Sequence, residues 1–162
     1  MLMSLFEKAY ADYVTVYKVP IGKNQLDPTI FEFPDDGSEP KLHDRIHAQI
    51  SSDLEAITGN DQPFRVEEYY LVGPALIPGT KDRTGNLEVL IQLNNKIRDE
   101  DLESVRGESA LKVANDLSNR VVEGSPLRKI TYRIITRPIK QEQFPAIYNI
   151  RTHSWMKLPQ NI

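Results

Sequence analysis

The spacing of apolar residues along the chain predicts a succession of helices and strands. Apolar residues recur every three or four positions, as on the buried face of a helix, over residues 5–13, 42–57 and 99–122. Alternating or β-branched stretches predict strands over residues 14–19, 30–33, 64–72, 86–93 and 129–137, and an edge strand over 147–155. This order predicts an α+β (α/β-like) fold, in which the helices pack mainly on one face of a mixed β-sheet.

Residues with strong preferences at helix ends set the expected boundaries. Ser38 is the expected N-cap of the second helix, with Pro40 in its first turn, and Gly59 is expected to end it. In the third helix, Gly107 is a candidate point of interruption. Its expected buried face consists of Leu102, Val105, Leu111, Ala114, Leu117 and Val121.

The strand over residues 86–93 has the clearest two-sided pattern in the chain. Its first expected face carries Leu87, Val89, Ile91 and Leu93, and its second carries Asn86, Glu88, Leu90 and Gln92. The second face is therefore the one that brings polar groups to the surface of the sheet.

We expect a single domain over residues 1–162. It divides into an N-terminal helix, strand and proline-rich loop (1–41), a core (42–137) and a basic C-terminal extension (138–162). Residues 20–40 hold four prolines and are expected to form a long loop. Loops of that length are usually functional, mobile or involved in assembly.

Composition narrows the function classes. The chain of 162 residues is 40% hydrophobic and 27% charged, which is typical of a globular protein. It has no cysteine, which excludes disulfides, iron–sulfur clusters, thiolate zinc sites and cysteine nucleophiles. It also lacks an apolar run of about 18 residues and a signal-peptide pattern, so we expect a soluble cytoplasmic protein with no membrane partner.

Charge is unevenly distributed although the net charge is only −3. Residues 124–162 contain seven basic residues and one acidic residue, Glu142. Such a segment can attract phosphates or nucleic acid, or it can dock on the acidic part of its own fold or of a sister chain.

One pair of segments has a spacing that is compatible with phosphate chemistry. Leu71-Val72-Gly73-Pro74 is followed, after eleven residues, by Asn86-Leu87-Glu88-Val89. A glycine turn lets backbone N–H groups approach a triphosphate. Two carboxylates two residues apart on a strand share one face and can hold a pair of magnesium ions.

This arrangement resembles the signature of the nucleotidyltransferase superfamily (the polymerase-β-like fold), and the resemblance covers roughly residues 42–137. It implies a nucleotidyltransferase-like fold, with Mg²⁺ and a nucleoside triphosphate as cofactors for nucleotidyl transfer. It further implies that Glu88, helped by Asn86, is the catalytic and metal-binding group. The implied phosphate-binding residues are Gly73, Lys81, Arg83 and Arg133.

Three positions depart from the family pattern. Pro74 stands where Gly or Ser is expected and has no N–H to offer a phosphate. Asn86 stands at the first carboxylate, and the strand over 129–137, which carries the third carboxylate in the family, has none. The resemblance therefore indicates a degenerate member that has lost two-metal catalysis.

Structural explanations remain open beside the functional ones. Glu88 and Arg133 can form a cross-strand ion pair, and residues 79–85 can be a surface loop rather than a phosphate cradle. His43 and His47 have a spacing compatible with metal binding, but the chain lacks the His-Glu-x-x-His pattern there, and we interpret them as solvated helix histidines. Two further functions also remain open. One is a non-enzymatic scaffold that uses the 20–40 loop and the basic segment 124–162 to contact a sister chain or another protein, and the other is nucleic-acid binding through that basic segment.

Overall fold

The computed structural model describes residues 26–59, 65–76, 85–94, 100 and 105–159. The helix and strand expected over 5–13 and 14–19 lie outside these residues. The helices are α2 (Asp44–Thr58) and α4 (Val105–Leu117), with two 3₁₀ turns, η1 (Pro74–Leu76) and η2 (Gln141–Gln143). The strands are β1 (Phe31–Glu32), β2 (Lys41–Leu42), β3 (Val66–Val72), β4 (Leu87–Leu93), β5 (Arg120–Val122), β6 (Ser125–Ile135), β7 (Ile147–Asn149) and β8 (Ser154–Lys157).

Six of the strands form one mixed sheet in the order β5-β6-β4-β3-β7-β8, and β1 pairs with β2 separately. β4 and β6 are parallel, whereas the other neighbours are antiparallel. A parallel pair needs a crossover connection, and α4 lies between these two strands in the chain. The α+β class and the mixed sheet predicted from the sequence are thus confirmed.

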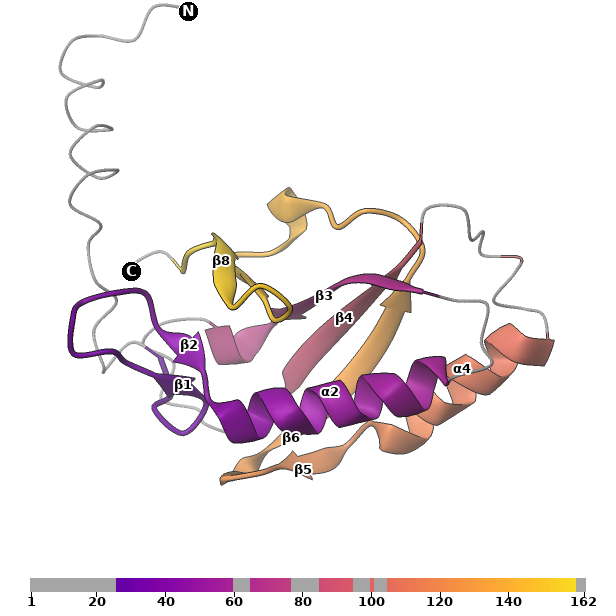
Figure 1. Ribbon diagram of the computed structural model, residues 1–162, viewed down its shortest axis with the longest axis horizontal. Helices are drawn as coiled ribbons and strands as arrows, with labels where there is room; N and C mark the ends of the chain where they lie inside the picture. Colours follow the sequence, from indigo (N-terminus) through magenta and orange to yellow (C-terminus); the bar gives the residue numbers. More distant parts are fainter. Residues whose placement is uncertain (1–25, 60–64, 77–84, 95–99, 101–104, 160–162) are drawn as a thin grey trace, which may run out of the picture.

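The main core lies between the helices and one face of the sheet, and Figure 1 shows α2 and α4 on the same side of it. The apolar stripe predicted for α2 is buried at Ile46, Ile50, Leu54 and Ile57. The alternation predicted for β4 is also confirmed, because Leu87, Val89, Ile91 and Leu93 all belong to this core.

The opposite face of the sheet, which we call the helix-free face, carries a second and smaller apolar cluster. Tyr70, Val72, Leu90 and Ile147 are buried in it. Ile135, Ile139 and Phe144 pack against it. In Figure 1 the chain between β6 and β7, including η2, runs above the sheet on the side away from the helices.

The beginning of α2 differs from the sequence prediction. His43 is the N-cap rather than Ser38, and the preceding residues Lys41 and Leu42 form β2. Ser38 stands before β2, too far from the helix start at Asp44 to cap it, and its N–H donates to Asp36 Oδ1 at 2.9 Å in a local turn. The C-terminal prediction is confirmed, since the Gly59 N–H caps Glu55 O at 2.8 Å with a φ of 58°.

The third predicted helix ends five residues earlier than expected, at Leu117 instead of Val122. Asn119 adopts a φ of 67°, and its N–H donates to Ile130 O at 2.7 Å. The chain therefore leaves the helix and joins the sheet as β5, where Val121 is 52% exposed and Val122 is buried. Gly107 lies inside α4 without interrupting it.

The predicted buried face of α4 is only partly correct. Ala114 is buried as expected, and Leu117 packs against the core. Leu111, by contrast, is 41% exposed. Leu102 lies outside the described residues. The helix therefore contacts the core through a narrower stripe than its apolar residues suggest.

The predicted edge strand over residues 147–155 consists of two short strands. β7 pairs with β3 inside the sheet, and β8 forms the edge. Trp155 on β8 contacts the rings of Phe31 and Tyr148, with centroids 5.4 and 5.1 Å away. This aromatic group joins the C-terminal strands to the segment before α2.

The described part of the 20–40 segment is built into the core instead of forming a free loop. Leu26, Ile30 and Phe31 are buried in the main cluster. Asp27 is buried as well, and its carboxylate accepts a hydrogen bond from Arg128 Nε at 2.8 Å. Burial alone would raise the pKa of Asp27, but hydrogen bonds from Arg128 and Thr29 outweigh it and lower the pKa.

A second buried carboxylate attaches α2 to the sheet. Asp53 on α2 accepts hydrogen bonds from the Tyr132 hydroxyl on β6 and from the Arg120 guanidinium on β5. Burial, followed by the hydrogen bond to Asp53, raises the pKa of Tyr132. No helix among the described residues is long and apolar enough to cross a membrane.

We expect Asp27→Ala to destabilise the fold by about 3–5 kcal/mol, because it leaves the Arg128 guanidinium, whose side chain is 3% exposed, without its counter-charge. Urea unfolding gives the change in free energy. The double variant Asp27→Leu with Arg128→Met should recover much of the loss, and Asp35→Ala at an exposed position is the control. A loss for Asp27→Ala no larger than that for Asp35→Ala would contradict the assignment.

Candidate functional site

The turn after β3 lies against the first residues of β4, as the spacing of the two motif segments requires. Gly73 has a φ of 100°, a conformation that glycine adopts without strain. A methyl group on Gly73 would stand 3.4 Å from both Cβ and Oε2 of Glu88. The structure therefore brings Gly73 and Glu88 together, with the carboxylate beside the glycine backbone.

The turn itself offers few donors to a phosphate. Pro74 follows Gly73 and opens the 3₁₀ turn η1, and it has no N–H. The Leu76 N–H already donates to Gly73 O at 3.1 Å. Two of the three residues of this turn therefore have no free backbone donor, which makes it a poor cradle for a triphosphate.

A buried arginine fixes the entry to β4. Arg128 Nη1 donates to Gly85 O at 2.7 Å, and the same guanidinium is paired with Asp27. Gly85 in turn lies close to Pro74, because a methyl group on Gly85 would stand 3.2 Å from Pro74 Cβ. Both ends of the connection between β3 and β4 are thus held beside each other.

Glu88 lies on the helix-free face, between Val72 of β3 and Thr131 of β6. Its side chain is half-buried and forms no hydrogen bond or ion pair within the part of the chain that the structure describes. Arg133 lies one register step further along, opposite Leu90. The alternative of an ion pair between Glu88 and Arg133 is therefore wrong, and the carboxylate has no partner among the described residues.

The donor set around Glu88 is too small for a two-metal site. The described residues contain no group of three or more His, Asp and Glu side chains that could hold a metal ion. Asn86 is exposed just before β4 and supplies an amide where a second carboxylate would be needed. Among the described residues Glu88 could therefore offer a metal one carboxylate, which would suffice only for a magnesium ion that brings most of its ligands with it.

Two of the predicted phosphate-binding residues cannot be placed. Lys81 and Arg83 lie outside the described residues, as does most of the candidate phosphate cradle over 79–85. Arg133 is exposed on the same face as Glu88.

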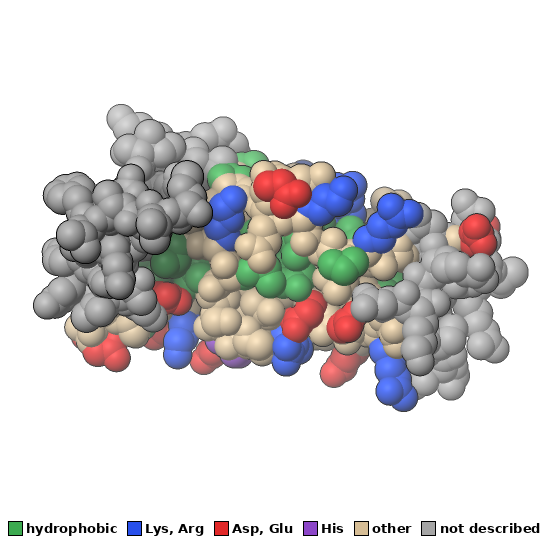
Figure 2. Space-filling model, turned by 90° about the horizontal axis from the view of Figure 1, so that it is seen from above, with side chains coloured by type: hydrophobic (Ala, Val, Ile, Leu, Met, Phe, Trp, Pro, Cys, Tyr) green, Lys and Arg blue, Asp and Glu red, His purple; other side chains and the backbone are tan. Residues whose placement is uncertain are grey.

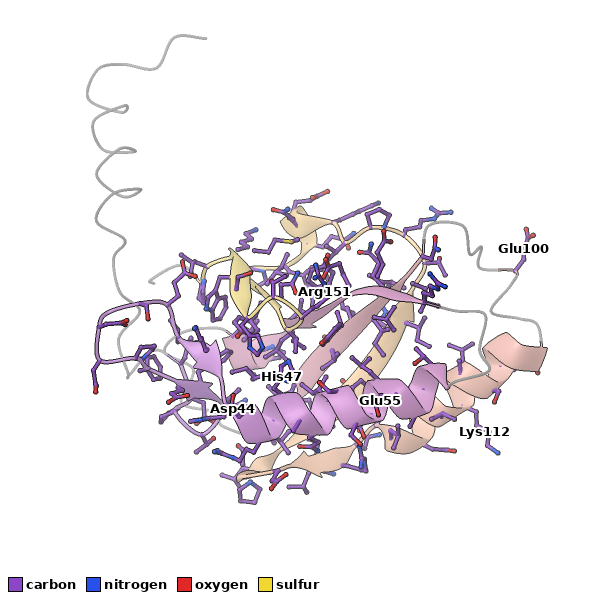
Figure 3. The ribbon with its side chains drawn as sticks, in the orientation of Figure 1. Asp44, His47, Glu55, Glu100, Lys112 and Arg151 are labelled. Atoms are coloured by element: carbon purple, nitrogen blue, oxygen red, sulfur yellow. The ribbon has the colours of Figure 1, made fainter. Side chains whose placement is uncertain are left out.

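The basic C-terminal segment is divided between internal contacts and one pocket. Arg128 pairs with Asp27, and Arg151 donates to Glu68 Oε1 and Oε2 from an exposed position (Figure 3). The hydrogen bonds that Arg151 donates to Glu68 lower the pKa of this carboxyl group. Burial acts in the opposite direction, and the hydrogen bond from Asn149 lowers the pKa further. Part of the segment therefore docks on acidic residues of its own fold, which was one of the alternatives.

Three of the remaining basic residues line a pocket of about 210 Å³ on the helix-free face. Arg133, Arg137 and Lys140 line it, and Leu90, Ile135 and Phe144 supply apolar lining. Sequence reasoning identified Arg133 and missed the other two cations. The sequence feature that could have indicated Arg137 is an alternation that begins on one face of β6 and continues just past its end: Thr131, Arg133, Ile135 and Arg137. Pro138 follows, and the chain then returns over the sheet.

The histidines form a ring stack instead of a metal site. His43 Nε2 lies 2.8 Å from Pro28 O, and the ring of His47 on α2 stacks on that of His153, with centroids 4.5 Å apart. His47 Nε2 is buried and has no hydrogen-bond partner in the structure. His153 has a φ of 54°, and its ring lies against that of His47, which is labelled on α2 in Figure 3.

We expect the fold to lose stability as the pH falls through the range in which His47 titrates. Burial lowers the pKa of His47, His153 lowers it further, and the Ile150 backbone and Asp44 oppose this more weakly. Near and below an unfolded-state pKa of about 6.5, the unfolded chain binds more protons than the folded one, so stability decreases toward lower pH. Urea unfolding between pH 7.5 and 5 measures the slope, which His47→Gln should reduce. An unchanged slope in that variant would refute this explanation.

No protein family model matches the chain, and neither a curated protein nor a solved structure matches it. The interpretation of the site therefore depends on its own geometry. The adjacency of Gly73 and Glu88 on the helix-free face and the cationic pocket beside it are the two features from which function is inferred.

Proposed function

We propose that the protein is a nucleotidyltransferase-like nucleotide-binding protein in which catalysis of nucleotidyl transfer is largely lost. In this proposal a nucleoside triphosphate lies on the helix-free face, with its phosphates near Gly73 and Glu88. Apart from the short strand β5 between α4 and β6, the order α2, β3, glycine turn, β4, α4, β6 agrees with the order of elements that the sequence resemblance implies.

The observation that carries the proposal is the position of the Glu88 carboxylate beside Gly73. A Cβ atom at position 73 would lie in van der Waals contact with Oε2 of Glu88. The absence of a side chain at Gly73 therefore leaves space beside the carboxylate, and any larger residue would fill that space. A half-buried carboxylate without a partner in the described structure is costly unless a cation or donor completes it. A cation carried by a nucleotide satisfies that requirement.

Glu88 is the residue that would hold magnesium, with Asn86 as a weaker neutral ligand. Mg²⁺ commonly binds through one or two carboxylates together with substrate phosphates, and this donor set fits that mode. When bound, the ion supplies charge neutralisation for the phosphates. Arg133, exposed on the same face, is suited to bind phosphate oxygens in a bidentate manner.

The same geometry argues against efficient transfer. Two-metal catalysis stabilises both the attacking and the leaving oxygen, and it needs carboxylates that this strand pair lacks. The neighbour of Glu88 on β6 is Thr131, which is neutral, and Arg133 further along cannot ligate a metal. Binding without turnover is the function that these residues support best.

A thermal-shift panel with the four ribonucleoside triphosphates, each with and without Mg²⁺, tests the proposal. A ligand present at about 100 times its dissociation constant stabilises the fold by about 2.7 kcal/mol. We expect a magnesium-dependent shift with at least one nucleotide and its loss in Glu88→Gln. Glu55→Gln makes the same chemical change at an exposed position on α2 (Figure 3) and should keep the shift. Flat curves with every nucleotide would contradict the proposal.

Asn86→Asp tests the metal role directly. The variant restores a second carboxylate near Glu88 and should strengthen Mg²⁺-dependent nucleotide binding about tenfold, or about 1.4 kcal/mol. Isothermal titration calorimetry with and without Mg²⁺ measures the change. A variant that binds no more tightly than the original protein would count against residues 86 and 88 as a metal site.

A scaffold role is the second candidate, and one surface supports it. The hairpin of β5 and β6 lies at an edge of the sheet and exposes Val121 by 52% and Leu127 by 63%. Large apolar side chains at a sheet edge are a feature of protein contacts. Sedimentation velocity on the original protein and on Leu127→Lys would distinguish self-association through this edge from a monomeric nucleotide-binding protein.

A further inference from the structure

The pocket beside Glu88 combines an apolar lining with a concentration of positive charge. Leu90 and Ile135 come from adjacent strands, and Phe144 comes from the segment that crosses the helix-free face. Arg133, Arg137 and Lys140 also line it, and no acidic residue does. Figure 2 shows Lys and Arg side chains beside hydrophobic ones on a face of the molecule seen from above the view of Figure 1.

The three cations are not neutralised within the described structure. Arg133, Arg137 and Lys140 make no ion pair and no side-chain hydrogen bond there. Arg151 and Lys157, which follow Lys140 in the extension, do have partners, namely Glu68 and Gln141 O. Clustered cations repel one another, so an anion that binds among them relieves that repulsion.

The size of the pocket limits what it can hold. Pockets for drug-sized ligands usually have volumes of about 300–1,000 Å³. A volume of about 210 Å³ is below that range and is too small to enclose a whole nucleoside triphosphate. One apolar ring with one charged group fits this space.

We propose that this pocket binds a small organic phosphate that carries a single apolar ring. The ring packs against Leu90, Ile135 and Phe144, and the phosphate meets Arg133, Arg137 and Lys140. Three cations favour a dianionic phosphate over a singly charged carboxylate, and two arginines provide bidentate donors for its oxygens. The proposal needs neither Glu88 nor magnesium, so it does not depend on the nucleotide function proposed above.

Isothermal titration calorimetry with phenyl phosphate, benzoate, inorganic phosphate and phenol tests both halves of the pocket. We expect phenyl phosphate to bind at least tenfold more tightly than any of the other three compounds, without magnesium and equally well in Glu88→Gln. Equal affinity for phenyl phosphate and inorganic phosphate would overturn the role of the apolar lining. Equal affinity for phenyl phosphate and benzoate would overturn the preference for phosphate, and failure to bind phenyl phosphate at millimolar concentration would overturn the proposal.

Matched variants assign the binding to this pocket. The double variant Arg137→Gln with Lys140→Gln changes exposed side chains and should weaken phenyl phosphate binding at least tenfold. Lys112→Gln removes a positive charge from α4, where Figure 3 shows the side chain pointing away from the sheet, and should leave the affinity unchanged. Unaltered affinity in the double variant, or an equal loss in Lys112→Gln, would refute the assignment.

Discussion

The buried pair of Asp27 and Arg128 is the contact through which distant parts of the chain are fixed relative to one another. Arg128 on β6 binds the Asp27 carboxylate with one nitrogen and Gly85 O with another, so the segment before β1, the entry to β4 and β6 meet at one guanidinium. Asp27 also holds Thr29 through its backbone N–H and its hydroxyl. Buried ion pairs contribute little net stability, but they determine geometry strongly, and here they determine where β4 begins.

The position of Glu88 follows from that arrangement. Because β4 starts where Arg128 holds Gly85, the side chains of β4 alternate with a fixed register between β3 and β6. One set enters the core beneath α2, and the other places Glu88 and Leu90 on the helix-free face. A shift of one residue would exchange the two sets and bury the carboxylate. The candidate site therefore depends on a contact that contains none of its own residues.

Sequence periodicity predicted the long elements and failed where tertiary contacts competed with it. The stripe of α2 and the alternation of β4 were confirmed, because burial on one side leaves a regular pattern. The end of α4 was predicted wrongly because Val121 and Val122 continue a helical spacing, whereas Asn119 turns the chain into the sheet. The N-cap was also wrong, because Lys41 and Leu42 pair with β1 as a strand and the helix begins only at Asp44.

The candidate site was predictable only where its residues are close in sequence. Gly73 and Glu88 belong to two strands joined by one connection, so their spacing indicated their proximity. The pocket combines β4, β6 and the segment after β6, and although Arg133 was predicted as a phosphate-binding residue, nothing in the sequence indicated that the segment after β6 brings Lys140 beside it. Charged residues that pair over a long distance in the sequence leave no local pattern from which the pair can be predicted. Asp27 and Arg128, at a separation of 101 residues, are such a pair.

The contact between Trp155 and Phe31 also determines when the protein can fold during its synthesis. Phe31 lies near the beginning of the described chain, and Trp155 near its end covers that ring and donates to Pro40 O at 2.9 Å. The aromatic end of the core therefore stays incomplete until β8 has left the ribosome. Until then the rings of Phe31 and Tyr148 lack the cover that Trp155 gives them, and apolar surface exposed in this way favours aggregation.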